Sequence, residues 1–156
     1  MQRTNSPTNA STDEHGEGLR VVVVGCGRIG SELACAFDDG GLAVSVIDIA
    51  PGAFSRLGPT FKGTMHEGPG YDLEVMRDAG VEAASALIAA TDSDNVNAIT
   101  VHVAKQVFGV PVTIALLNDM KHRSTYRALA IDYVAAPTVL GFPSNRGGLL
   151  IDCCRL

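Results

Sequence analysis

The feature that most constrains the fold of this chain is a run of four valines, residues 21–24, followed at once by a glycine-rich turn. Residues 25–30 read Gly-Cys-Gly-Arg-Ile-Gly, which has the Gly-x-Gly-x-x-Gly spacing. The first glycine permits a tight strand-to-helix turn, the second lets the backbone approach a pyrophosphate, and the third lets the helix pack against the strand. The amides that open the helix also form an anion site. The pattern therefore predicts a nucleotide-binding strand–turn–helix unit.

A carboxylate follows at the distance where such units bind ribose. Asp48 lies near the end of the next apolar run, residues 44–49. A carboxylate there accepts hydrogen bonds from ribose hydroxyls and repels a 2′-phosphate, which favours NAD(H) or ATP/ADP over NADP. Arg28, inside the turn, is expected to bind a phosphate oxygen through its guanidinium. Two alternatives stay open: Asp48 is only a surface carboxylate, or the turn serves packing in a unit that binds nothing.

Strand and helix patterns alternate along the chain. This alternation predicts an α/β fold, a single Rossmann-like domain with a doubly wound parallel sheet of about six strands. Strands are expected at 20–24, 43–48, 63–67, 85–90, 112–117 and 132–135, and helices near 29–39, 52–57, 72–79, 93–108 and 119–129. In the longest helix, apolar residues form two sides, so much of its circumference is expected to be buried. One side consists of Val96, Ile99, Val103 and Val107, and the other of Val101, Ala104 and Phe108.

Further site candidates come from the carboxyl ends of the predicted strands, where ligands bind in sheets of this kind. The glycine turn follows the first strand, and Asp48 ends the second. Glu67 and Gly68 lie at the end of the third strand, and Ala90, Thr91 and Asp92 at the end of the fourth. Thr91 has an equally good alternative role, because it precedes a helix and is a natural N-cap residue.

Composition narrows the classes of partner and location. A chain of 156 residues with a hydrophobic fraction of 46% has room for one domain with a proper core. A net charge of −5 argues against a nucleic-acid partner. Residues 1–18 contain little to bury, so they are expected to form a disordered leader before a domain spanning 19–140. The chain carries no secretory signal or membrane-length apolar run, which predicts a cytoplasmic protein.

Catalytic and metal-binding patterns are harder to find in this sequence. The four cysteines lack metal-ligand spacing, so we expect buried thiols and no metal site. The four histidines are scattered, and His66, which lies near the expected crevice, has no recognisable nucleophile or orienting partner. We identify no catalytic residue and expect a binding protein rather than an enzyme.

Several ordered motifs together resemble one known family. They are the turn at 25–30, Asp48, Gly-Pro-Gly-Tyr-Asp at 68–72, the run at 73–81 and Ala-Ala-Thr-Asp-Ser-Asp-Asn-Val-Asn at 89–97. This set resembles the nucleotide-binding domain of Trk/Ktr-type potassium-uptake regulators, also called the RCK N-terminal or TrkA-N domain. The resemblance covers roughly residues 19–140.

The resemblance implies a cytosolic regulatory subunit that is peripheral to the inner face of the membrane through its partner. That partner would be a membrane potassium transporter or channel, gated by nucleotide occupancy. The regulator itself would be a homo-oligomer or a hetero-oligomer with a paralogue. Its expected nucleotide-binding residues are Gly25, Cys26, Gly27, Arg28, Ile29, Gly30, Asp48, Glu67, Ala90 and Thr91. The turn and Arg28 would hold phosphate, Asp48 would bind ribose, and the last three would line the adenine and ribose pocket.

The sequence departs from the family pattern at three places. Thr138 follows Pro137 where many members have a glutamate, and Leu116 follows Ala115 where many have an arginine. Residues 141–156 are expected to form a short tail or truncated crossover helix in place of a ligand-sensing domain. Fewer pocket charges imply weaker binding. Two other functions stay open, an NAD-dependent oxidoreductase fragment completed by another chain and a ligand-free assembly module.

Overall fold

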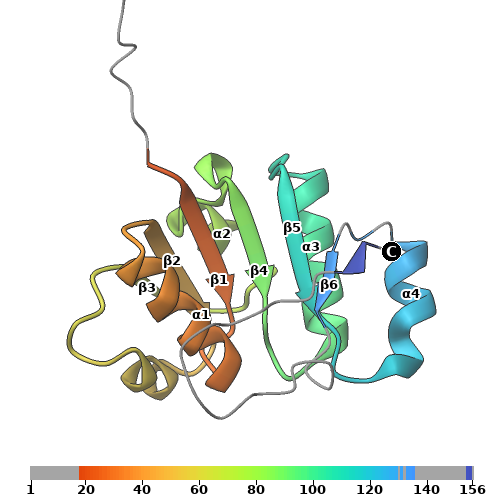
Figure 1. Cartoon of the computed structure of the whole chain (residues 1–156). Helices are drawn as coiled ribbons and strands as arrows, with labels where there is room; N and C mark the ends of the chain where they lie inside the picture. Colours follow the sequence, from red (N-terminus) through yellow and green to blue (C-terminus); the bar gives the residue numbers. More distant parts are fainter. Residues whose placement is uncertain (1–17, 130, 132, 136–153, 156) are drawn as a thin grey trace, which may run out of the picture.

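The computed structural model describes residues 18–129, 131, 133–135 and 154–155, which build one seven-stranded sheet in the order β3-β2-β1-β4-β5-β6-β7 (Figure 1). Its strands are β1 (Arg20–Val24), β2 (Ala43–Asp48), β3 (Thr64–Glu67), β4 (Ala86–Ala89), β5 (Val112–Leu116), β6 (Tyr133–Ala135) and β7 (Cys154–Arg155). Strands β1 to β6 pair in parallel, and β7 pairs antiparallel with β6. The predicted doubly wound Rossmann-like fold is confirmed.

Helical segments connect the parallel strands and cover both faces of the sheet (Figure 1). The α-helices are α1 (Arg28–Asp39), α2 (Leu73–Asp78), α3 (Asp94–Gln106) and α4 (Arg123–Ala128), and the 3₁₀ segments are η1 (Pro51–Leu57), η2 (Val81–Ala83) and η3 (Met120–His122). The helix expected at 52–57 is therefore a 3₁₀ helix, begun by Pro51 and ended by Gly58 at a positive φ of 73°. The segment expected as one helix at 119–129 is divided into η3 and α4.

The valines of β1 divide the core into two layers, because successive side chains of a strand point to opposite faces. Val21 and Val23 pack with Leu33 of α1 and Leu57 of η1. Val22 and Val24 pack in the other layer, which includes Met76 of α2, Val101 of α3 and Tyr126 of α4. With both faces covered, the central strands are continuous apolar runs, as parallel sheets require.

The expected burial of the longest helix is confirmed for Val101 and Ala104 but is wrong for Ile99 and Val107. Ile99 of α3 is 47% exposed, and Val107, the C-cap residue that follows α3, is 55% exposed. The buried side begins with the polar residues Asp94, Asn97 and Thr100 before it continues with small and apolar ones. The physical reason is that the first half of α3 packs against the ends of two strands, where the backbone needs hydrogen-bond partners.

The predicted domain limits fall largely outside the described residues. The leader at 1–18 is described only at Gly18, and the tail at 141–156 only at Cys154–Arg155, which form β7. Both limits stay predictions. Among the residues that the structure describes, no helix is long and apolar enough to cross a membrane.

Candidate functional site

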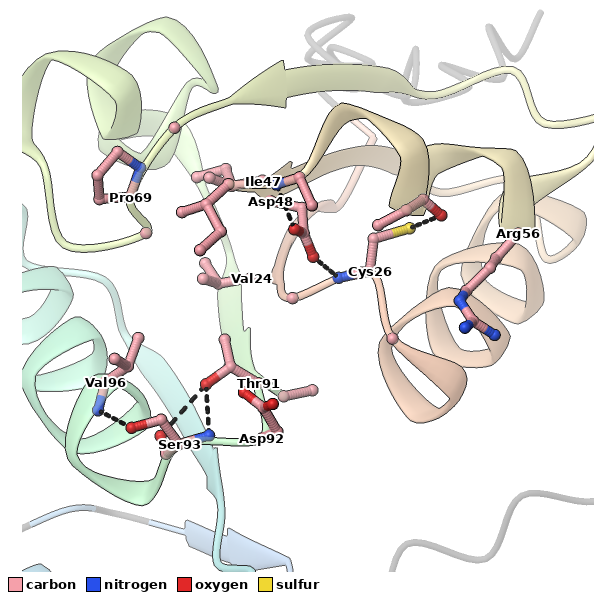
Figure 2. A pocket seen from close by; sticks show the side chains of 18 of the residues that line it. Val24, Cys26, Ile47, Asp48, Arg56, Pro69, Thr91, Asp92, Ser93 and Val96 are labelled. Atoms are coloured by element: carbon pink, nitrogen blue, oxygen red, sulfur yellow. Dashed lines mark hydrogen bonds between the residues drawn. The ribbon is translucent and has the colours of Figure 1, made fainter.

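A pocket of about 860 Å³ opens at the carboxyl ends of β1, β2 and β4. It lies where the sheet order reverses, between β1 and β4, which is the position at which doubly wound sheets bind ligands. Its wall consists of the glycine turn, the end of β2, η1, the loop at 68–71 and the segment from Ala90 into the start of α3 (Figure 2).

The three glycines of the turn meet different surroundings. Gly25 has a φ of +97°, and a Cβ there would lie 2.8 Å from the carbonyl oxygen of Ala90. A Cβ at Gly30 would overlap the carbonyl oxygen of Gly25, whereas a Cβ at Gly27 would meet nothing within 4 Å. The first and third glycines are therefore required by packing, while the second leaves open space at the start of α1.

The Asp48 side chain connects the glycine turn to the end of β2 through hydrogen bonds. Its Oδ2 accepts a hydrogen bond from the backbone N–H of Cys26 at 2.6 Å, and its Oδ1 accepts one from the N–H of Ala50 at 2.8 Å (Figure 2). Each carboxylate oxygen retains a further lone pair for another donor. The side chain can thus hold the turn in place and still accept a hydroxyl from a ligand.

Two thiols attach η1 to the glycine turn and to α1. The Cys26 thiol donates to the carbonyl of Ala53 at 3.4 Å, and the Cys35 thiol donates to the carbonyl of Leu57 at 3.4 Å. Burial, together with the nearby Asp48 carboxylate, raises the pKa of Cys26 to about 11. Burial also raises the pKa of Cys35. Both groups are therefore neutral thiols at neutral pH and act here as structural donors.

A buried amide holds the segment at the end of β4. The Asn97 side chain has no exposed surface, and its Oδ1 accepts from the Thr91 backbone N–H at 2.9 Å and the Thr91 hydroxyl at 2.6 Å. Its Nδ2 donates to the carbonyls of Thr91 and Leu116, each at 3.0 Å. Thr91 is thereby oriented at the pocket wall by a residue from α3 and tied to the end of β5.

A buried carboxylate continues this network away from the pocket. Asp94 accepts from the backbone N–H groups of Asn118 and Asp119 at 2.6 and 2.9 Å, and its Oδ2 lies 2.8 Å from Nδ1 of His122. Burial alone would raise the pKa of Asp94, but these hydrogen bonds outweigh it and hold the pKa below its usual value. The Tyr126 hydroxyl lies 2.9 Å from the carbonyl oxygens of Asp94 and Leu116. Polar bonds thus join the ends of β4 and β5.

The structure brings most, but not all, of the predicted site residues together. Gly25, Cys26, Gly27, Asp48, Ala90 and Thr91 line the pocket. Arg28, Ile29, Gly30 and Glu67 lie outside its lining. Arg28 is an exposed residue at the first position of α1, and Glu67 is exposed beside Asp48 in the register of β3. Their roles in binding stay predictions. His66 also lies outside the lining, and Pro137 and Thr138 are outside the described residues.

Sequence reasoning missed the contribution of η1 and of residues 69–71, although it included Gly68, which also lines the pocket. Arg56 lines the pocket from η1, eight residues after Asp48. The loop reaches the pocket because Gly70 lies against Val24, where a Cβ would overlap the valine side chain. The Gly-Pro-Gly sequence at 68–70 was the available signal for the loop, whereas no local pattern distinguishes Arg56 from an ordinary surface arginine.

Comparisons with known proteins agree with this fold. Residues 21–137 match the TrkA-N domain family. The chain is 41% identical over 117 residues to the Trk system potassium uptake protein TrkA of Streptomyces coelicolor, covering 75% of this chain and 52% of that protein. It is 25% identical over 119 residues to a TrkA homolog of Methanothermobacter thermautotrophicus, covering 76% and 55%. The chain thus spans about half the length of these curated relatives.

Solved structures share the fold at low sequence identity. The TrkA-N domain of the inner membrane protein ybaL from Escherichia coli is similar with a TM-score of 0.69 and 19% identity, covering 78% of this chain and 90% of that one. GsuK bound to ADP is similar with a TM-score of 0.67 and 21% identity, covering 81% and 32%. The GsuK channel bound to NAD is similar with a TM-score of 0.63 and 20% identity, covering 83% and 23%.

Proposed function

This chain belongs to the TrkA-N domain family, and from that membership we propose that it is a nucleotide-binding regulatory subunit of a potassium transporter or channel. The observation that carries the proposal is the open space at Gly27, which faces the start of α1 beside the Asp48 carboxylate. The 41% identical relative from Streptomyces coelicolor is a potassium uptake protein. GsuK, which shares the fold, has been solved with ADP and with NAD.

The pocket fits an adenine nucleotide, NAD(H) or ATP/ADP. A volume of about 860 Å³ lies within the usual range for small-molecule sites. The backbone amides that open α1 would hold phosphate, because they lie at the positive end of the helix dipole. Asp48 would accept from ribose hydroxyls, and the segment from Ala90 to Thr91 would line the ribose and adenine. Arg28, Ile29, Gly30 and Glu67 would support these contacts from the border of the pocket.

Regulation would come from binding without a catalytic step. A ligand shifts a conformational equilibrium only by its difference in affinity for the two states. A nucleotide in this pocket would contact segments that follow β1, β2 and β4 at the same time, so their relative position would affect its affinity. The network from Thr91 through Asn97 to Leu116 connects the pocket wall to β5. Through this shift, the nucleotide would control two things. One is the assembly of the chain with copies or paralogues in the cytoplasm, and the other is the gating of the membrane partner.

Potassium uptake in cells that lack this chain tests the proposal. Uptake at limiting potassium is expected to recover with the natural chain but not with Gly27→Asp, whose carboxylate would occupy the phosphate position. Gly18→Asp is the matched control, because Gly18 is exposed and a Cβ there meets nothing within 4 Å. Equal recovery with Gly27→Asp, at equal protein levels, would contradict nucleotide-dependent regulation.

A further inference from the structure

The charges around the pocket are unevenly distributed. Among the described residues that line it, the charged side chains are Asp48, Asp92 and Arg56. Two carboxylates and one guanidinium give this lining a formal charge of −1. A nucleotide carries several negative charges, so a side-chain cation within the pocket has a large effect on whether phosphates are accepted.

Arg56 is held in place by the segment that carries it. The carbonyl of Ala53, three residues earlier, accepts from the Cys26 thiol, and the carbonyl of Leu57, the next residue, accepts from the Cys35 thiol. The Leu57 side chain is buried against the α1 layer. Arg56 therefore extends from a backbone that is fixed on both sides, which lowers the entropy cost of using its guanidinium in binding.

The guanidinium lies on the glycine-turn side of the pocket. In the view of Figure 2, Arg56 and Asp48 lie on opposite sides of Cys26. Its charge is close enough to the turn to act on the Cys26 thiol, whose pKa it lowers against the larger effect of burial. Within the described part of the chain, no carboxylate forms an ion pair with Arg56. The group is thus exposed, near the turn and available to an anion.

We propose that Arg56 is the residue that selects phosphate-bearing ligands in this pocket, by binding the 5′-phosphates of an adenine nucleotide. This inference rests on the proposed nucleotide-binding function. A guanidinium presents parallel N–H donors that match phosphate oxygens, which makes it a stronger and more directional partner than a backbone amide alone. Arg28 then has a lesser part in affinity, since it lies outside the lining.

Equilibrium binding to the full chain tests this assignment, with ADP, NADH and NADPH titrated directly and adenosine measured as a competitor of ADP. Arg56→Met is expected to lower the affinity for ADP and for NADH by about tenfold to a hundredfold, the range for losing a charged hydrogen-bond partner. The affinity for adenosine is expected to change less than about twofold, because adenosine has no phosphate. Arg56→Lys should recover part of the affinity, and Arg28→Met should cost less than Arg56→Met.

Four results would overturn the assignment. The first two are an unchanged affinity for ADP in Arg56→Met and a loss of affinity for adenosine equal to that for ADP. The third is a loss of ADP affinity that occurs only in Arg28→Met. The fourth is a loss of affinity in Arg56→Met that is confined to NADPH, which would place the guanidinium at a 2′-phosphate instead. A natural chain that binds no adenine nucleotide would overturn the proposed function as well. The two failures are thus distinguishable, because the first four require that the natural chain binds.

Discussion

Asn97→Asp is expected to lower the free energy of unfolding by about 4 kcal/mol, the scale for leaving a buried charge without compensation. The two side chains have nearly the same shape, but aspartate has no N–H donors. In the natural chain the Asn97 Nδ2 group donates to the carbonyls of Thr91 and Leu116. The substitution would leave both carbonyls facing a carboxylate in a place with no solvent exposure.

Urea denaturation at neutral pH measures this loss, and the same helix supplies the control. Asn95 is exposed in the first turn of α3, so Asn95→Asp introduces the same charge without burial. A negative charge near a helix N-terminus is neutral or slightly stabilising. If Asn97→Asp were as stable as Asn95→Asp, the amide network would not hold the end of β4 as described.

Gly30→Ala is expected to destabilise the chain by about 2 kcal/mol through steric overlap. Alanine favours a helix over glycine by about 1 kcal/mol, so helix propensity alone predicts the opposite sign. The overlap is with the backbone carbonyl oxygen of Gly25, which directly follows β1, a strand that is paired on both sides. The helix would have to move away from the turn, because neither backbone can give way locally.

Thermal and urea unfolding of Gly30→Ala beside Gly27→Ala measures this difference. Gly27 has a φ of −73°, which any residue adopts, and a Cβ there meets nothing within 4 Å. Gly27→Ala is therefore expected to cost less than about 1 kcal/mol, the small penalty of alanine in place of glycine at an N-cap. Equal stability of the two variants would show that α1 does not approach the turn as closely as the structure has it.

The elements that could be predicted from the sequence are those with local, repeated signals. The valines of β1, the glycine spacing and Asp48 each carry a pattern within about thirty residues. Because parallel strands end at one edge of a sheet, the meeting of the turn, Asp48 and Thr91 at one pocket also followed from the order of elements.

The parts that escaped prediction depend on contacts between distant residues. The buried side of α3 begins with Asp94 and Asn97. Asn97 bonds to Leu116 at the end of β5, and Asp94 bonds to Asn118 in the turn that follows this strand. Hydrophobic periodicity instead favours Ile99 and Val107, which are exposed. Arg56 reaches the pocket only because the η1 segment folds back against α1, where the thiol of Cys26 holds it. Neither arrangement leaves a signal in neighbouring residues.

Calorimetric titration of the purified chain with ADP and NADH, beside Gly27→Asp, tests the central claim that this pocket binds an adenine nucleotide. Gly27 is the N-cap of α1 and makes no side-chain capping bond, so an aspartate there is expected to preserve or slightly raise stability. Its carboxylate would nevertheless repel phosphate from the amides that open the helix. The account predicts saturable binding to the natural chain and none to an equally stable Gly27→Asp. No saturable binding of either nucleotide to the natural chain, or equal affinity in the variant, would contradict it.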